Sequence, residues 1–528
     1  MLKKLGVQIV VVLVGALFFT AYAQTTTVGT ISGTVRDEKG AIVPKAEVSI
    51  QSEGTGISRT VTADDNGFYL APSLPAGLYT VSTAPHGFKK TVASAVDKVV
   101  NLDLQVGQVT ETVTVTADAV PVETRSGEVS SLISEKQVTE LPLNGRNYAQ
   151  LVTLVPGISP VTQAGAGGAF LTGGTGLDSH VDMSVNGNQS NANLWTVDGV
   201  NNMDVGSNAT LLVFPSIDSI KEFRVERNSF SAEYGQAQGA VINLITKGGT
   251  NQFHGTAFEF IRNDKLNAND FFLKNRGLPR PTLRYNNYGF NFSGPIYLPR
   301  FGEGGKKVWD GKNRAFFFWS EEWRAERRGL VPPLQFKVPT AAERVGDFSG
   351  SLTAALPHDP LTGNPFPGNK IPADRLSPAG LAIMKFFPLP NTALSGGVNF
   401  VFSPVEPINT RQDSIRGDFN INRKTNLMVH YINETWLHGN AGGNFWGDTG
   451  FPTISSDWDQ PSNSFAVKLA TTLSSSSVNE FQFSCQDKRG GGVHQPGDCL
   501  KVPYGLSKTE RRGLADFLGR GWLPRIVA

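Results

Sequence analysis

The chain has 528 residues and a formal net charge of +2, with 48 Lys and Arg against 46 Asp and Glu. A nearly neutral chain carries no charge signal for binding nucleic acid or an acidic surface, so neither is expected as a partner. The content of 57 Gly, 31 Pro and 33 Phe favours many short strands and turns over helices. The length predicts several domains.

Residues 1–23 have the pattern of a secretory signal peptide. Two lysines precede an apolar run at 7–19, and small residues then offer a cleavage site at Ala21, Ala23 and Gln24. The apolar run is shorter than the ~20 residues that a spanning helix needs. No later segment is long and apolar enough to span as a helix, so a membrane protein of this kind must cross as a closed barrel.

Residues 28–106 contain short strand patterns separated by turn signals, which predicts a small β-sandwich. The words DDNGFY at 64–69 and LPAGLY at 74–79 resemble the carboxypeptidase regulatory-like domain family. That resemblance implies a prealbumin-like, carbohydrate-binding-like fold and no peptidase activity. Each of these sequence motifs also has a purely structural explanation, such as the tight hairpin turn favoured by Asn66-Gly67. Carbohydrate contact by the sandwich therefore rests on fold analogy alone.

Residues 107–130 are expected to be a coupling segment and a linker. An alternating β-branched run resembles a TonB box, the peptide that adds as a strand to a TonB-type energy-coupling protein; its residues are Glu111, Thr112, Val113, Thr114, Val115, Thr116 and Ala117. Alternation suits strand addition, because the main chain gives affinity and alternate side chains give specificity. The alternative is that residues 112–116 form the last strand of the sandwich.

Residues 131–250 resemble the plug domain of TonB-dependent outer-membrane receptors. The segment 137–157 resembles the opening helix and turn of that family, and 185–200 resembles a strand pair ending in an Asp-Gly turn. The strand expected at 217–227 precedes the most specific match, a plug-end motif formed by Tyr234, Gly235, Gly239, Val241, Ile242, Asn243, Thr246 and Lys247.

Residues 251–486 show the alternation expected of a partial outer-membrane β-barrel, with one apolar and one polar face on each strand. Seven strands are predicted, at about 253–263, 284–296, 314–326, 411–422, 426–436, 462–473 and 478–485. If the first strand rises from the periplasm, two of the three periplasmic connections are short and the outer ones are long, as in such barrels. Tryptophans near strand ends or in loops are candidates for interfacial belts or for loop packing: Trp309, Trp319, Trp323, Trp436, Trp446 and Trp458.

The last stretch, 487–528, departs from the family pattern. Plugged barrels need about 22 strands, alternation stops after Gln486, and the chain ends in Val-Ala where family members end on an aromatic residue. We therefore expect 487–528 to be an aberrant tail of a chain truncated within the barrel. Cys485 and Cys499 are the two cysteines, and in an exported chain a disulfide between them is one of two open alternatives.

No enzyme, metal site or cofactor is predicted. The seven histidines form neither an H-x-x-x-H nor an H-E-x-x-H pair, and neither G-x-S-x-G nor a phosphate-binding glycine spacing is present. Glu321 and Glu322 are adjacent acids, but neighbouring strand residues point to opposite faces. They are expected to be lumen-facing or rim charges near Arg324, Arg327 and Arg328.

Together the patterns predict a mainly β protein: a prealbumin-like sandwich, an α+β plug and the first part of an antiparallel outer-membrane barrel. The resemblance implies an Oar-like TonB-dependent receptor in the outer membrane, with sandwich and plug on the periplasmic side. Its expected partners are a TonB-type protein, membrane lipid and an unidentified imported ligand, with carbohydrate or another large nutrient as candidate classes. The alternatives are a non-transporting surface-binding or adhesion protein and a nonfunctional gene fragment.

Overall fold

The computed structural model describes residues 29–494, except for 76, 86–87, 96–99, 106–111, 116–126, 161–180, 182, 205–207, 233, 236, 300–307, 330–332, 352–355, 423, 442–454, 475–476 and 491–492. The expected signal peptide, its cleavage site at Ala21, Ala23 and Gln24, and most of the expected tail lie outside the described residues. So do Glu111, Thr116, Ala117, Trp446 and Cys499.

The first domain is a sandwich of two sheets, as the turn spacing predicts. One sheet has the order β4-β1-β7, from Phe68–Leu74, Gly29–Asp37 and Leu102–Leu104. The other has the order β3-β2-β5-β6-β8, from Ser58–Thr62, Glu47–Ser52, Tyr79–Thr83, Lys90–Ala95 and Thr112–Val115. Alternate residues of both sheets fill one core that includes Val35, Val48 and Val81. Val and Leu at every second position are what a sheet buried on one face requires.

The second domain is built on a five-stranded mixed sheet with the order β13-β12-β15-β14-β9. These strands are Val200–Asn201, Leu194–Val197, Val241–Thr246, Ile220–Asn228 and Val129–Ile133. Helix α2 (Glu135–Glu140) and the hairpin of β10 (Ile158–Pro160) and β11 (Met183–Val185) accompany this sheet. Its largely aliphatic core contains an aromatic cluster, in which the Tyr148 ring lies 6.4 Å from the Trp195 ring and 4.5 Å from the Phe214 ring.

The third part is one long antiparallel sheet. Its seven long strands are β16 (His254–Asn263), β17 (Leu283–Pro295), β20 (Ala315–Gly329), β23 (Val405–Asn422), β24 (Thr425–Ala441), β26 (Ser462–Ser474) and β27 (Ser477–Gly490). Each predicted strand is present, and neighbours pair in chain order. Two short strands, β25 (Ser455–Asp459) and β28 (Val493–His494), pair with β24 and β27. The described sheet is open, with β16 at one edge.

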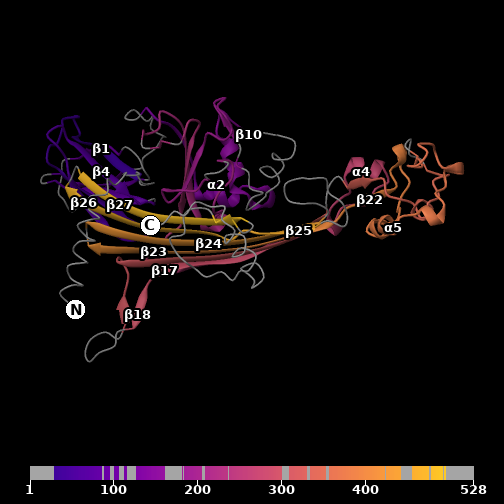
Figure 1. Ribbon diagram of the computed structural model, residues 1–528. Helices are drawn as coiled ribbons and strands as arrows, with labels where there is room; N and C mark the ends of the chain where they lie inside the picture. The colour runs from indigo at the N-terminus through magenta and orange to yellow at the C-terminus, as the bar shows by residue number, and fades with distance from the viewer. Residues whose placement is uncertain are drawn as a thin grey trace, which may run out of the picture.

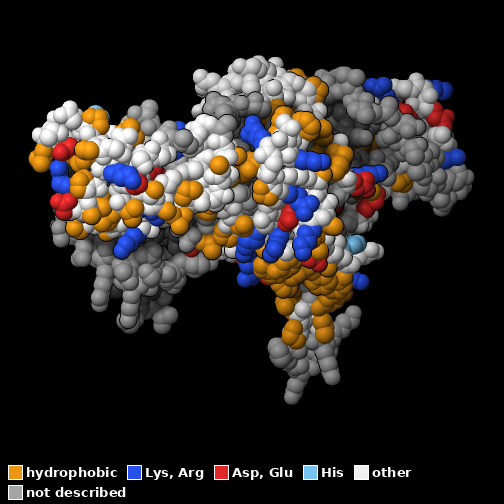
Figure 2. All heavy atoms as spheres, turned by 90° about the vertical axis from the view of Figure 1, so that its right-hand side faces the viewer, with side chains coloured by type: hydrophobic (Ala, Val, Ile, Leu, Met, Phe, Trp, Pro, Cys, Tyr) orange, Lys and Arg blue, Asp and Glu red, His pale blue; other side chains and the backbone are white. Residues whose placement is uncertain are grey.

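The two faces of this sheet differ in polarity, as the alternation predicts. Along β17, Tyr285 and Asn287 are buried, whereas Tyr288 and Phe292 are exposed. Sandwich and plug both lie on the same side of the sheet (Figure 1), and polar side chains of that face contact the plug. Figure 2 shows hydrophobic side chains gathered beneath the sheet, away from the plug. We call these the inner face and the outer face.

The connections explain two features of the sequence. The long connection at 297–313, which the sequence pattern predicts to be a periplasmic turn, contains a separate antiparallel pair of β18 (Tyr297–Pro299) and β19 (Val308–Asp310). At the opposite end of the sheet lie α4 (Phe271–Asn275), α5 (Pro378–Met384) and the pair β21 (Leu334–Phe336) and β22 (Phe400–Phe402), which belong to the long outer loops (Figure 1).

Three expectations need correction or refinement. Strand β27 continues to Gly490, beyond the predicted end of alternation, because its backbone still pairs with β26 as far as Lys488 opposite Ser462. Trp436 is not in an interfacial belt: it is 1% exposed and lies on the inner face beside His438. Cys485 is disulfide-bonded.

Candidate functional site

A tight turn of the plug points a buried carboxylate at the barrel strands. Asp198 and Gly199 join β12 to β13 with φ values of 50° and 85°, the conformation that Asp-Gly favours in two-residue hairpins. The Asp198 carboxylate accepts hydrogen bonds from the Thr246 hydroxyl at 2.6 Å and the Thr246 backbone N–H at 3.1 Å. The end of β15 therefore fixes the orientation of the turn.

Three barrel strands complete the contact. His430 Nδ1 on β24 lies 2.7 Å from Asp198 Oδ2, and Arg416 Nη1 on β23 lies 3.3 Å from Asp198 Oδ1. Gln482 on β27 donates to the backbone carbonyl of Asp198 at 3.3 Å. We call Asp198, Thr246, Arg416 and His430 the Asp198 latch. It joins residues more than 200 positions apart in the chain.

The latch determines the ionisation of Asp198. Burial by itself would raise the pKa of this carboxyl, but the Arg416 guanidinium, His430 and the Thr246 hydroxyl outweigh burial and hold the pKa of Asp198 well below its usual range. Asp198 is therefore an anion in the folded protein at neutral and mildly acidic pH. A buried charge of this kind is tolerated because it is paired and hydrogen-bonded.

A second contact clamps the plug backbone at Phe214. The backbone N–H of Phe214 donates to Glu434 Oε2 on β24 at 2.8 Å, and Gln412 on β23 donates to the Phe214 carbonyl. Barrel side chains thus satisfy both the N–H and the carbonyl of Phe214, and buried backbone groups require such hydrogen-bond partners.

Further contacts extend to the first strands of the sheet. Ser216 donates to Glu322 on β20, whose other oxygen accepts from Asn287 on β17 at 2.7 Å. The Arg146 guanidinium lies 4.8 Å and 4.2 Å from the ring centroids of Phe258 and Phe260 on β16, a cation–π arrangement. Contacts with the plug are therefore distributed from β16 to β27, and most of them are polar.

The plug-end motif builds a buried hydrogen-bond network inside the plug. The Asn243 amide donates to Glu226 Oε1 at 3.0 Å and to the Tyr234 hydroxyl at 3.3 Å, and it accepts from Thr196 at 2.5 Å. Asn243 thereby ties together β12, β14 and β15, as well as the loop that carries Tyr234. A fully connected network of this kind specifies one packing of the sheet.

The other motif residues have structural places as well. Val241 and Ile242 are buried in the plug core, and Lys247 Nζ lies 3.1 Å from Glu135 at the start of α2. A side chain at Gly239 would meet the Asn193 side-chain oxygen at 2.5 Å, so this position needs glycine. Gly235 has open space around it, and nothing in the structure explains why glycine stands there.

Replacing Asn243 by leucine is expected to lower the free energy of unfolding of the plug by about 1–3 kcal/mol per buried polar group that loses its partner. Hydrogen exchange of the β15 amides measures this effect. Thr196→Ser keeps the hydroxyl and serves as the control. Exchange rates unchanged in Asn243→Leu would show that the network does not stabilise the sheet.

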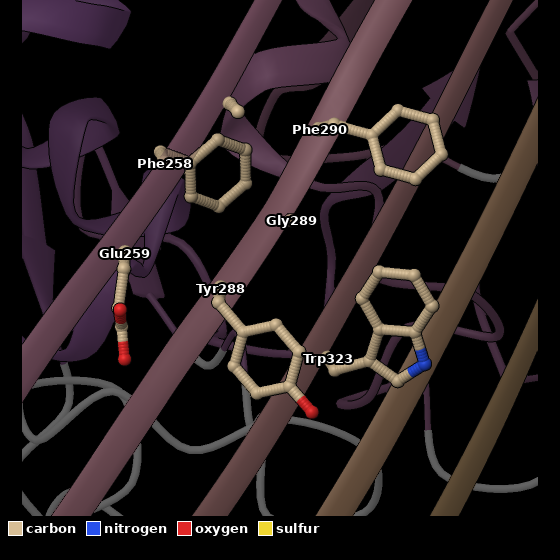
Figure 3. Close-up of a pocket in the computed structure, with 7 residues that line it drawn as sticks. Phe258, Glu259, Tyr288, Gly289, Phe290 and Trp323 are labelled. Carbon is tan, nitrogen blue, oxygen red and sulfur yellow. The ribbon is translucent and has the colours of Figure 1, made fainter.

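A shallow hollow of about 410 Å³ lies on the sheet between β16, β17 and β20. Figure 3 shows Tyr288, Phe290 and Trp323 on the face that looks away from the plug, with Glu259 beside them on β16. Tyr288 and Trp323 stand opposite each other in register and stack at 5.6 Å. An open aromatic surface beside a carboxylate suits the boundary between lipid and water; it is not the enclosed cavity that small ligands prefer.

Among the described residues, no group of three or more His, Cys, Asp or Glu is placed to hold a metal ion. Glu321 and Glu322 point to opposite faces: Glu322 contacts plug residue Ser216, whereas Glu321 lies 3.6 Å from Arg411 on the outer face. In the part of the chain that the structure describes, no helix has the length and apolarity to cross a membrane.

Three family models match the chain in succession. Residues 30–118 match the carboxypeptidase regulatory-like domain, 121–241 the TonB-dependent receptor plug domain, and 245–503 the outer membrane β-barrel domain. The plug held on the inner face of a barrel sheet, together with these matches, defines the class. The chain therefore carries the plug and barrel domains of TonB-dependent receptors, which are proteins of the outer membrane.

Among curated proteins the chain is similar to the TonB-dependent transporter Oar of Myxococcus xanthus, at 29% identity over 262 residues. That match covers 47% of this chain and 23% of the relative, so the chain spans about a quarter of the relative's length. Among solved structures it is similar to a ferric enterobactin receptor of Pseudomonas aeruginosa (11% identity, TM-score 0.39, 68% of this chain and 41% of that one). The siderophore receptor PirA of Pseudomonas aeruginosa gives 12% identity and a TM-score of 0.35 over 68% and 40% of the two chains.

The plug-end motif lies in strand β15 and the segments on either side of it, whereas no sequence pattern assigned a role to the residues of the latch. Asp198 lies within the segment that resembles a plug strand pair, and its Asp-Gly signal gave the turn alone. His430 and Arg416 belong to the polar alternation of barrel strands, and no local pattern distinguishes them from other lumen-facing residues. The sequence does not show which residues of the barrel strands lie next to which residues of the plug, and this proximity is what identifies the latch.

Proposed function

We propose that this chain is the receptor of an energy-coupled import system, in which a plug inside the barrel controls passage of a ligand. The observation that carries this proposal is the character of the plug contacts. Hydrogen bonds and ion pairs join the plug to inner-face residues such as Glu322, Arg416 and Glu434. Polar contacts of this kind exchange with water at modest net cost, so the plug can be rearranged and then restored.

The proposed coupling segment is Glu111 to Ala117, of which Thr112–Val115 form β8. Its partner is a TonB-type energy-coupling protein that adds an extended strand. The long outer connection between β20 and β23 is the proposed site of ligand capture. The ligand is unassigned; carbohydrate or another large nutrient remains the candidate class, supported by fold analogy for the sandwich.

Titrating the purified periplasmic domain of a TonB-type protein into this protein in detergent micelles tests the proposal. We expect saturable binding, weakened at least tenfold by Val113→Pro with Val115→Pro, because proline removes the N–H groups that a strand partner needs. Glu123→Pro, outside β8, is the control and should bind normally. Equal binding by all three proteins would refute coupling through this segment.

A competing proposal is a surface protein that binds its partner without transport. The two differ in energy dependence: surface binding persists when the proton gradient is collapsed, whereas uptake stops. Deleting Glu111 to Ala117 should therefore abolish accumulation of a ligand and leave its surface binding intact. Unchanged accumulation after the deletion would contradict the transport proposal.

The outer face gives a further expected result for membrane insertion. Phe483 and Ser484 are neighbours on β27 that point to opposite faces, and Phe483 is 50% exposed among other outer-face apolar residues. Phe483→Arg is expected to cost about 2–4 kcal/mol near the bilayer midplane, and Ser484→Arg much less. The fraction of folded protein recovered in lipid vesicles measures both. Equal recovery would place the lipid face elsewhere.

A further inference from the structure

The proposed coupling segment is not a free peptide in this structure. Strand β8 runs parallel to β6, with Thr112 opposite Lys90, Thr114 opposite Val92 and Val115 opposite Ala93. It is the last strand of the sheet β3-β2-β5-β6-β8, and within the described residues β6 is its one paired neighbour. One edge of β8 is therefore held by the sandwich, and the other edge presents backbone N–H and C=O groups that no described strand occupies.

We propose that the energy-coupling protein adds its strand to this outer edge while β8 stays paired with β6. The sandwich would then be a docking platform whose sheet grows from five strands to six. This inference rests on the proposed coupling role of Glu111 to Ala117 and adds to it the manner of binding. The partner is a protein that presents an exposed, extended strand edge.

Conformational entropy favours binding in place. Ordering a disordered segment costs about 1–2 kcal/mol per residue in backbone entropy, and that cost lowers the affinity of any partner that must impose it. The β6 ladder has already ordered the residues Thr112 to Val115. A partner that separated β8 from β6 would also break the backbone hydrogen bonds between these two strands. Addition to the open edge of β8 breaks none of them. Exposed strand edges are templates for pairing with another chain.

The sandwich is anchored where force must enter the barrel. Its β2–β3 turn contacts the linker between plug and barrel, because the Asn251 N–H donates to the Gly54 carbonyl at 2.9 Å. The same linker residue exchanges hydrogen bonds with Asn313 in the connection before β20, at 2.6 Å and 2.8 Å. The Gly56 turn packs so closely on Asn313 that a side chain at this glycine would meet its oxygen at 2.3 Å. A partner docked on β8 is thus held at the periplasmic end of the barrel.

The chain then leads from the platform directly to the plug. After β8 it continues to β9, which is the edge strand of the plug sheet and, among the strands that the structure describes, pairs with β14 alone. Tension transmitted through 116–128 acts first on β9, an edge strand of five residues. Separating β9 from the plug sheet requires breaking only its hydrogen bonds to β14 among the described strands. The arrangement separates the docking strand β8 from the strand that yields, β9.

A reversible disulfide between β6 and β8 tests the inference. Val92 and Thr114 are opposite residues in the register, so Val92→Cys with Thr114→Cys locks β8 onto the sandwich when oxidised; mass spectrometry verifies the bond. The periplasmic domain of a TonB-type protein is then titrated into the oxidised and the reduced protein in detergent micelles, with each single cysteine variant as control.

We expect the dissociation constants of the oxidised and reduced proteins to agree within about twofold. Binding by the reduced protein and loss of binding by the oxidised protein would overturn docking in place, and would leave the coupling role of the segment intact. Absence of binding in both forms would count against the coupling proposal itself. Failure of the two cysteines to form the bond would contradict the pairing on which the inference depends.

A proline scan of Thr112, Val113 and Val115 in the two-cysteine protein provides an independent readout. Successive residues of a strand direct their N–H groups to opposite edges, so Val113 and Val115 share one edge and Thr112 belongs to the other. Proline at Val113 or Val115 should weaken the partner's binding at least tenfold and leave the β6 disulfide intact, whereas proline at Thr112 should impair formation of the disulfide instead. A uniform effect at all three positions would contradict the assignment of two separate edges.

Discussion

Asp198→Asn is expected to lower the free energy of unfolding of the plug by about 3–5 kcal/mol, the cost of removing one partner from a buried ion pair. Asparagine tolerates the positive φ of this turn, so the substitution removes the charge and keeps the backbone. Arg416 and His430 then face a neutral amide. Hydrogen exchange of the β12 and β15 amides, which flank the latch, measures the loss.

The control for this result is Asp103→Asn, an exposed aspartate of the sandwich that should change stability by less than about 0.5 kcal/mol. In a double-mutant cycle, Arg416→Gln added to Asp198→Asn should cost less than the sum of the two single changes, because the second removes a guanidinium that has already lost its ion pair with Asp198 and retains the one with Asp418. Additive costs would show that Asp198 and Arg416 do not act as a pair.

The latch also predicts how plug stability depends on pH. The pKa of Asp198 is depressed in the folded state, so its contribution is fully present above the unfolded pKa of about 3.9. It is lost only as pH falls through the depressed folded value. Between pH 5 and 8 the difference in stability between wild type and Asp198→Asn should therefore contain no contribution from titration of Asp198. Mild acidification is not expected to release the plug through this carboxylate.

Trp195→Ala is expected to lower the free energy of unfolding of the plug by about 3–5 kcal/mol. Trp195 is 1% exposed on the interior strand β12, and its ring meets Tyr148 edge-on at 6.4 Å. Truncation leaves a cavity under an aromatic cluster that also contains Phe214 and Phe223, and a close-packed core relaxes only partly into such a space.

Urea unfolding followed by hydrogen exchange of the plug amides measures this effect. Leu154→Ala is the matched control: this leucine belongs to the same plug domain, but it is 58% exposed, so its truncation should cost less than about 0.5 kcal/mol. Similar costs for the two variants would show that the aromatic cluster is not the centre of the plug core. The amides of the barrel strands should keep their protection from hydrogen exchange in both variants, because the hydrogen bonds between these strands do not involve Trp195.

The coupling segment shows how far a pattern can determine a role. Alternation from Glu111 to Ala117 predicted a β-strand and allowed two interpretations, a coupling peptide or the last strand of the sandwich. The structure places Thr112 to Val115 on the edge of the sandwich sheet, and the regulatory-like family match also extends to residue 118. Backbone pairing and a role in strand addition are compatible, since a strand has two edges.

The sequence alone determined the class of fold, the seven long strands and the general alternation of apolar and polar residues along them. Those features depend on local period, turn residues and alternating polarity, which each segment carries by itself. Tertiary structure alone decided that Asp198, Arg416 and His430 meet, that Trp436 turns inward, and that β8 rests on β6. Such contacts join segments far apart in the chain, and a carboxylate in a turn or a histidine in a strand carries no local mark of its partner. Their positions follow from how the plug is seated on the barrel sheet, which only the folded chain defines.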